Sequence, residues 1–398
     1  MKNKLSKDAS ILLAIGMLFL AGLMIASTFV NVYLIRLTND MGLMILQNIA
    51  NYAALLSAFM IGTRYVQKGG ILTLLRAGLF ADIIYYAMIL LLKEKAAAYL
   101  IPLGIFNGLG QGFYYFAFNL LVGKLTGENE RSKFFSYQTS FSYIFGVAAP
   151  MASGYIIVQF SELSGYYVLF ATSLIVFILA IIFSFQLKKV DIHESYHILP
   201  ILKLRHNPYW DVNKYLNFSF GFREAIYAQI FTVFSYLIIS NEQVIGNLNA
   251  MMSFIGVISS LMIASRFTLD NQRKYHFIFT IFYIISLSTL GIMATEWSLY
   301  LSYVINGVIL CWNSVIFQNL KYQLASRAKD GFNEGDYIIT TEFPMAAGRL
   351  SGLCIFFLLN LAAGGFHLYQ ALLVGISLIA ILDHIVLTKK INWLIPSK

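Results

Sequence analysis

The sequence predicts an all-α membrane protein whose helices cross the bilayer many times. Only 12% of the 398 residues are Asp, Glu, Lys or Arg, about half the usual share in a soluble globular protein. The mean hydropathy is +0.71, and the apolar residues run in blocks of about 20, a length that crosses the hydrocarbon core as a helix. A membrane β-barrel has short alternating segments instead. These observations exclude a soluble enzyme and a barrel.

The first apolar block resembles a secretory signal only at its start. Lys2, Lys4 and Lys7 precede it, but the run continues to Val30 without a small-residue cleavage site. We therefore expect it to be the first membrane span. The 2 cysteines, Cys311 and Cys354, lie inside later blocks, so no disulfide framework and no cysteine metal site are implied.

Twelve spans are predicted, joined by mostly short loops. The exception is the polar stretch 188–214, which carries Pro200 and Pro208. It separates a predicted N-terminal six-helix bundle, 1–187, from a C-terminal bundle, 215–398. The predicted spans are 10–34, 42–63, 72–92, 97–121, 134–158, 165–187, 215–239, 243–265, 275–295, 298–320, 337–361 and 367–388.

Basic residues predict the orientation of these spans. With the N-terminus inside, 22 of the 28 Lys and Arg residues fall on the inner side and only Arg36, Lys93 and Lys95 on the outer side. Inner loops are the ones that carry excess positive charge. We therefore expect both termini in the cytoplasm and the protein in the cell membrane, as a multi-pass protein of a bacterium. The net charge of +9 is then a topology signal, and no nucleic-acid partner is expected.

The two halves repeat when the second is placed on the first at an offset of about 200 residues, a sign of internal duplication. Both halves start inside, so the repeat is parallel and its axis runs along the membrane normal. The matched segments are 39–40 with 241–242, 60–65 with 262–267, 107–108 with 306–307, 119–120 with 319–320, and 129–130 with 333–334.

Twelve spans, inner termini, a long central loop and a parallel repeat together resemble the major facilitator superfamily. Between spans two and three, 62–69 is similar to the family's Gly-x-x-x-Asp-Arg-x-Gly loop, with Val66 and Gln67 in place of the acid and the base. On span five, 149–154 (Ala-Pro-Met-Ala-Ser-Gly) is similar to the Gly-Pro-x-x-Gly-Gly pattern of its exporters. The stretches 221–224 and 342–349 resemble the YqgE-type branch of bacterial transporters. The resemblance implies a cavity lined mainly by spans 1, 4, 7 and 10.

One face of span 4 fits such a cavity. Asn107, Gln111, Tyr114 and Phe118 follow one another at steps of 4, 3 and 4, which places them on one helical face. The repeat carries this pattern to span 10, and Tyr227 adds an aromatic group from span 7. We expect an uncharged wall of amides and aromatic rings; the alternative is amide contacts between packed helices. The predicted span-10 members are Asn306, Asn313 and Phe317.

Ionisable residues inside spans are costly and usually functional. Span 7 carries Arg223 and Glu224, and span 11 carries Glu342 and Arg349. Two pairings are open, Arg223 with Glu342 or Glu224 with Arg349. Burial raises the pKa of a carboxyl group and a nearby arginine lowers it, so a pair that breaks and reforms would couple protons to transport. A static structural pair is the alternative.

Asp82, halfway along span 3, is a further candidate proton carrier, because Arg76 lies six positions away on another helical face. A local hydrogen bond is the alternative role. Near the inner end of span 12, Asp383 and His384 are expected to be an interfacial pair.

The central loop contains His193-Glu194-Ser195-Tyr196-His197, which matches the His-Glu-x-x-His signature of zinc peptidases. A third ligand is also needed, for which His206 or Asp211 could serve. Pro200 limits any helix here, and the loop offers no substrate cleft. We therefore interpret the stretch as a solvated linker with no metal.

The sequence predicts a secondary active transporter, not an enzyme, that moves a small amphipathic or hydrophobic solute by alternating access. No phosphate-binding Gly-x-x-x-x-Gly-Lys-Ser/Thr loop is present, so we expect proton coupling, no cofactor and a monomer in the lipid bilayer. Export, as in an efflux antiporter, is favoured over nutrient import. The alternatives are a flippase for a lipid-linked sugar or glycolipid, a membrane zinc metallopeptidase, and a sensor that transports nothing.

Overall fold

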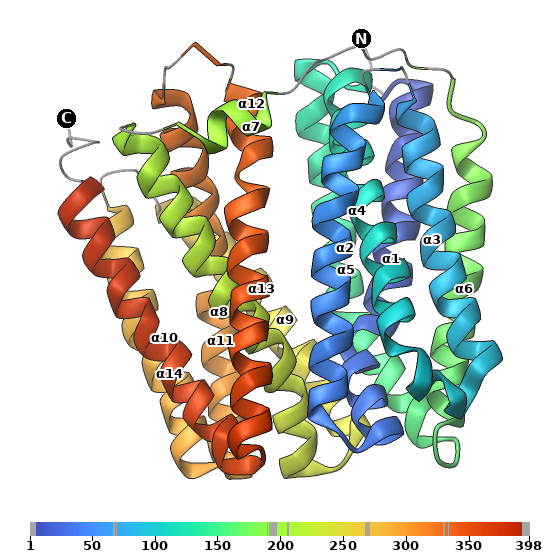
Figure 1. The fold of residues 1–398 in the computed structure, drawn as a ribbon, viewed down its shortest axis with the longest axis vertical. Helices are drawn as coiled ribbons and strands as arrows, with labels where there is room; N and C mark the ends of the chain where they lie inside the picture. Colours follow the sequence, from blue (N-terminus) through green and yellow to red (C-terminus); the bar gives the residue numbers. More distant parts are fainter. Residues whose placement is uncertain are drawn as a thin grey trace. The chain divides into compact units, whose positions relative to one another are not determined.

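Twelve long helices make up the fold of the computed structural model (Figure 1). The structure describes residues 5–66, 68, 70–188, 190, 197–204, 207–266, 271–328, 331–332 and 334–391. Within these residues every regular element is helical. The predicted all-α class and the count of twelve spans are therefore confirmed.

The long helices have 21 to 32 residues each, enough to cross a bilayer. They are α1 (Lys7–Thr38), α2 (Met41–Val66), α3 (Ile71–Leu92), α4 (Leu100–Leu125), α5 (Glu128–Val158), α6 (Ser164–Ser184), α8 (Pro208–Ile239), α9 (Glu242–Arg266), α10 (Gln272–Met293), α11 (Glu296–Arg327), α13 (Glu342–Ala363) and α14 (Phe366–Val386). The short elements are η1 (Lys93–Tyr99), α7 (Ile198–Leu202), α12 (Glu334–Thr340) and η2 (Leu387–Ile391).

The observed helices extend beyond several predicted spans. In the described residues, 11 helical segments are long and apolar enough to span a membrane, and one of them, Ile71–Leu125, holds both α3 and α4. The predicted span 337–361 is divided, because α12 ends at Thr340 and α13 begins at Glu342. The predicted central loop contains α7 and the first turns of α8.

Local capping explains where the helices that carry the site begin. Asn207 caps α8 by accepting a hydrogen bond from the Trp210 backbone N–H at 2.9 Å, and Pro208 occupies the first helical position. Proline is tolerated there because its missing N–H would have no partner within the helix. Thr295 and Ser298 form a capping box at the start of α11, which satisfies two otherwise unpaired backbone groups.

The chain divides into two compact units, each described separately below. One unit comprises Met1–Ser195 with Asn241–Ala250, and the other comprises Tyr196–Ser240 with Met251–Lys398. The first part of α9 thus belongs to the first unit and its remainder to the second.

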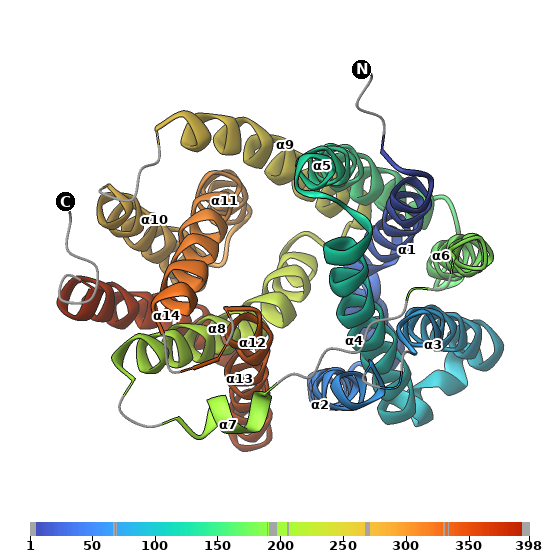
Figure 2. The ribbon, with the colours of Figure 1, turned by 90° about the horizontal axis from the view of Figure 1, so that it is seen from above.

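In the first unit, α4 packs against both α2 and α3 (Figure 2). Close approach requires glycine at Gly108, where a Cβ would collide with the backbone oxygen of Asn51 on α2. On α1, Phe19 stacks on Tyr114 with ring centroids 3.4 Å apart and meets Phe177 of α6 edge-on. These rings form an aromatic core that joins α1, α4 and α6.

One ion pair fixes the start of α9 within the first unit. Arg36, near the end of α1, binds Glu242 with an Nη1–Oε1 distance of 2.7 Å. The same oxygen accepts a hydrogen bond from the Tyr166 hydroxyl at 2.8 Å. Because Glu242 is 6% exposed, this pair and the tyrosine satisfy a buried carboxylate.

In the second unit, α8 packs along α13, and α10 packs between α11 and α14. Gly348 of α13 faces the backbone oxygen of Phe218 on α8, where any side chain would collide. The linker segment α7 packs on the same unit through Ile201, which joins Trp210 and Tyr337 in one buried cluster. The second unit therefore brings together the helices that carry most of the charged candidate residues.

Candidate functional site

A cavity of about 220 Å³ lies among α8, α10 and α11 in the second unit. Its walls combine aromatic rings with one cation, one carboxylate and one amide. They consist of Phe220, Arg223, Glu224, Tyr227, Phe279, Tyr283, Leu310, Asn313 and Ser314.

Helical spacing places these groups on the cavity side. On α8 the lining positions are 220, 223, 224 and 227, a pattern of i, i+3, i+4 and i+7 that covers one helical face. Phe279 and Tyr283 lie four residues apart on α10. Four predicted site residues, Arg223, Glu224, Tyr227 and Asn313, thus line one cavity.

The cavity's cation and its carboxylate are each paired with a different helix. Arg223 binds Asp383 of α14 with an Nη2–Oδ2 distance of 2.6 Å, and their side chains are 7% and 3% exposed. Glu224 binds Arg349 of α13 with an Oε2–Nε distance of 2.7 Å. The structure therefore contains the Glu224–Arg349 pairing, one of the two left open by the sequence, and pairs Arg223 with Asp383 instead of Glu342.

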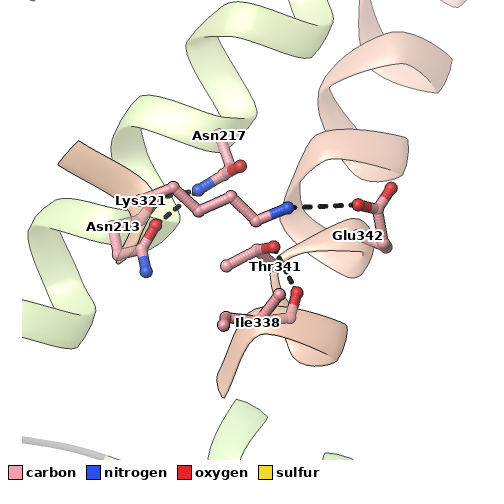
Figure 3. A network of polar contacts seen from close by, with 6 residues as sticks. All are labelled: Asn213, Asn217, Lys321, Ile338, Thr341 and Glu342. Atoms are coloured by element: carbon pink, nitrogen blue, oxygen red, sulfur yellow. Dashed lines mark hydrogen bonds and ion pairs between the residues drawn. The ribbon is translucent and has the colours of Figure 1, made fainter. Parts of the chain in front are cut away.

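Glu342 has a different partner, as Figure 3 shows. Its Oε1 lies 3.3 Å from the Nζ of Lys321 on α11. In the same view, Asn217 donates to Asn213 within α8, and Thr341 donates to the backbone oxygen of Ile338 at the break between α12 and α13. Glu342 sits in the first turn of α13, where a carboxylate is favoured by the helix dipole.

Buried hydrogen bonds orient Tyr227, one of the two tyrosines of the cavity wall. Asn306 of α11 is fully buried and donates to the Tyr227 hydroxyl at 3.3 Å. Its amide oxygen accepts a hydrogen bond from Ser286 of α10 at 3.3 Å. Asn306 therefore acts behind the cavity wall. Phe317 stacks on Phe220 of α8 with ring centroids 4.4 Å apart, and so supports the same wall.

Of the four predicted residues of α4, two amides bind each other and two aromatic rings pack in the core of the first unit. Gln111 donates to Asn107 at 2.8 Å, as their i, i+4 spacing allows. Tyr114 and Phe118 are 2% and 4% exposed. Their rings stack on one another, and Tyr114 also stacks on Phe19. In this structure their contacts are those of a packed core.

Asp82 of α3 is fully buried against α4. A Cβ on Gly110 of α4 would touch the carboxyl group of Asp82. Among the described residues neither Asp82 oxygen has a hydrogen-bond partner. The nearby Arg76 instead donates to the backbone oxygen of Ser184 on α6, at 3.1 Å.

The expectation that Asp383 and His384 form an interfacial pair is wrong for Asp383. This residue is 2% exposed and bound to Arg223, because α14 turns it toward α8. His384 contacts His276 of α10, with 3.2 Å between their Nδ1 atoms. Charged residues at i and i+1 point in different directions on a helix, so the sequence gives no sign of either partner.

The structure describes only part of the zinc-peptidase pattern and of its proposed third ligands. His193, Glu194 and His206 lie outside the described residues. His197 lies within them, and its backbone N–H donates to Asp336 of α12 at 3.3 Å. Asp211 forms an ion pair with Lys214 at 2.8 Å. Across the part of the chain that is described, no cluster of three or more His, Cys, Asp or Glu residues could hold a metal ion.

Comparison with known proteins decides the family. The model of the Major Facilitator Superfamily matches residues 95–333, more than half of the chain. The chain belongs to the major facilitator superfamily. The resemblance noted in the sequence is thereby confirmed.

A relative in one bacterium agrees with the YqgE-type resemblance, and a second relative comes from another bacterium. The chain is 28% identical to the uncharacterized protein YqgE of Bacillus subtilis (strain 168) over 366 residues, which cover 89% of this chain and 83% of that protein. It is 30% identical over 165 residues to a Geobacillus stearothermophilus protein described as an uncharacterized protein in the sodM 3'region. That match covers 42% of this chain and 77% of the relative.

Solved structures share the fold at low sequence identity. A bacterial metal transporter has a TM-score of 0.65 and 15% identity, covering 97% of this chain and 99% of its own. A POT family transporter in complex with a thioalcohol-conjugated peptide has a TM-score of 0.70 and 11% identity, covering 98% and 96%. A D-xylose–proton symporter has a TM-score of 0.66 and 12% identity, covering 94% and 96%.

Proposed function

We propose that this superfamily member is a secondary active transporter that binds a small amphipathic solute in the cavity of the second unit. The cavity carries this proposal, because it joins four aromatic rings with the amide of Asn313 and the charged groups of Arg223 and Glu224. Aromatic rings bury apolar surface and stack on ligands, while an amide and charges fix orientation. Such a wall suits a solute with an apolar body and a polar end.

The size of the cavity limits the solute. Pockets for drug-sized ligands occupy about 300–1,000 Å³, and this cavity has about 220 Å³. A solute of metabolite size therefore fits better than a large drug. A larger molecule would need to leave part of its surface outside this unit.

Proton coupling is the energy source that the charges favour. A carboxylate bound to arginine loses that partner's attraction when it takes up a proton. Glu224 is bound to Arg349 and lies on the cavity wall, so solute and proton would act on the same side chain. The Glu224 side chain is 35% exposed, so the protein around it does not seal it off.

Outward transport and the orientation in the membrane rest on sequence. The Pro-containing stretch 149–154 of α5 is similar to the pattern found in the superfamily's exporters. The distribution of basic residues supports a cytoplasmic position for both termini in the plasma membrane. We therefore propose export, by a monomer exchanging its solute for protons.

Solute-induced proton movement tests this function across many solutes with a single readout. Purified protein is reconstituted into liposomes that contain a pH-sensitive dye, and a panel of small amphipathic solutes is added. We expect one class of solute to move protons in the wild type, and Glu224→Gln to abolish this movement. We expect Asn313→Ala, which removes the amide from the cavity wall, to weaken this movement as well. Asn319→Ala is its matched control and should leave the movement unchanged. Asn319 lies on the same helix, lines none of the cavities described here, and donates to its own helix at Val315.

Three results would count against the proposal. The first is uptake of a labelled solute that moves no protons in the wild type. The second is proton movement that is equal in Glu224→Gln and in the wild type. The third is a loss of proton movement in Asn319→Ala as large as in Asn313→Ala, which would remove the cavity from the mechanism.

A further inference from the structure

Two histidines from different helices meet beside the cavity. His276 lies in the second turn of α10 and His384 in the last turn of α14. Their Nδ1 atoms are 3.2 Å apart and their rings are nearly parallel, at 11°. These are the distance and the atoms of an N–H···N hydrogen bond.

This geometry limits the protons that the two rings hold. Two bare nitrogens at 3.2 Å would repel through their lone pairs, and two N–H groups would collide, so one proton must lie between the Nδ1 atoms. A neutral imidazole has one donor and one acceptor nitrogen. If His384 donates, its Nε2 is bare and can accept one further proton without breaking the contact. Uptake of that proton changes the charge of the pair from 0 to +1 while α10 and α14 stay in place. Burial and the nearby Arg223 disfavour a charge on His276, so the added proton is placed on half-buried His384.

Exposure gives this proton a route to the interior. His384 is half-buried, whereas His276 is 5% exposed. Thr280 of α10 lies 3.4 Å from the His276 Nδ1. The charged and titratable groups of the other packed helices at this place are Arg223 and Tyr215 of α8 and Asp383 of α14, and Tyr283 lies on α10 itself. The histidine pair thus faces one cation and one carboxylate, which are bound to each other.

A small void lies between His276 and residues of the cavity wall. It has about 10 Å³ and is bounded by polar groups of His276, Arg223, Asp383 and Asn313, with apolar side chains completing the wall. Arg223 and Asn313 also line the larger cavity. Among the described residues, the Arg223 Nε and the Asp383 Oδ1 have no hydrogen-bond partner. Each partner of this ion pair therefore has binding capacity left over.

We propose that His276 and His384 form a proton-binding site that controls the cavity through the Arg223–Asp383 ion pair. A proton added to the pair places a positive charge beside Arg223, which it repels, and beside Asp383, which it attracts. The ion pair weakens, and the guanidinium of Arg223 becomes available to the cavity for an anionic group of the solute, such as a carboxylate. This rests on the proposed transport function, in which Glu224 carries the exchanged proton. It adds a separate control of the cavity by pH, and it gives the solute an acidic end.

The test uses the whole protein in lipid nanodiscs, labelled with ¹⁵N at histidine and arginine, across a pH series. We expect a scalar coupling between the His276 and His384 Nδ1 atoms through their shared proton, and one titration that also shifts the Arg223 Nε resonance. In His384→Gln and His276→Gln the coupling is lost and the arginine resonance stops following pH. His367→Gln is the matched control, because His367 lies in the first turn of α14, at the opposite end from His384, and its side chain contacts Gln370.

Several outcomes overturn the proposal. These are the absence of the Nδ1–Nδ1 coupling, an arginine resonance that still titrates in both histidine variants, and a control that behaves like them. Stoichiometric Zn²⁺ binding to the wild type that is lost in His384→Gln would make the pair a metal site instead. Since the spectra need no solute, they stand apart from transport. A linked titration with no solute movement refutes the transport function alone, and solute movement without the linkage refutes this site alone.

Discussion

The Arg223–Asp383 ion pair should be among the most sensitive points of the second unit. Removing one partner of a buried pair leaves an uncompensated charge and costs about 3–5 kcal/mol. The full cost is expected here, because the two side chains are only 7% and 3% exposed. We therefore expect Asp383→Asn and Arg223→Gln each to lower the free energy of unfolding by about 3–5 kcal/mol.

A double-mutant cycle measures whether the two side chains act as a pair. In the combined variant neither charge is left alone, so its loss of stability should be smaller than the sum of the single losses by at least about 1 kcal/mol. The assay is reversible unfolding in mixed micelles as the fraction of denaturing detergent rises. Glu342→Gln is the control, because its pair with Lys321 is longer, at 3.3 Å, and more exposed. Its cost should stay below about 1 kcal/mol. Additive losses in the cycle would refute the reasoning.

Three further changes test other parts of the structure, with stability measured in the same unfolding assay. The free energy of unfolding of Asp82→Asn should lie within about 1 kcal/mol of the wild-type value, because the change removes a carboxyl group that has no described partner. If Asp82 carries protons, the same variant should weaken proton movement in liposomes. Unchanged movement would exclude that role. Gly348→Ala should lower the free energy of unfolding by about 1–3 kcal/mol, because it overpacks α13 against α8. Gly375→Ala should not lower it, because a Cβ there would have no atom within 4 Å. Equal effects of the two changes would contradict the close helix contact. Asn306→Ala should cost about 1–3 kcal/mol by leaving buried polar partners unpaired, and a neutral result would mean that its two hydrogen bonds are not formed.

The span pattern could be predicted because it depends on local sequence. Blocks of apolar residues fix twelve helices, and the i, i+4 spacing of Asn107 and Gln111 correctly suggests that their side chains meet. The break between Thr340 and Glu342 was not predicted, although Thr341, Glu342 and Pro344 are typical of a helix start, because the span was drawn from the apolar residues on either side. Helix ends beyond the apolar core were missed for the same reason.

Pairings between helices could not be predicted in the same way. Spacing places Arg223 and Glu224 on adjacent positions of one helix, but it does not say which neighbouring helix each one faces. Asp383 and His384 are 160 and 108 residues away from Arg223 and His276, so their contacts depend on how α8, α10 and α14 pack. The signal that was available is their position: a carboxyl group inside an apolar segment rarely lacks a partner.

Ligand-induced stabilisation of the purified protein tests the central claim most directly. A solute that binds the folded state raises the apparent melting temperature, and the rise grows with the logarithm of the ratio of its concentration to its Kd. We predict that small amphipathic solutes with an acidic end stabilise the wild type and Asn319→Ala, and that Asn313→Ala and Tyr227→Phe reduce this shift. If the stabilising solutes act equally on all four proteins, the cavity among α8, α10 and α11 is not the solute site.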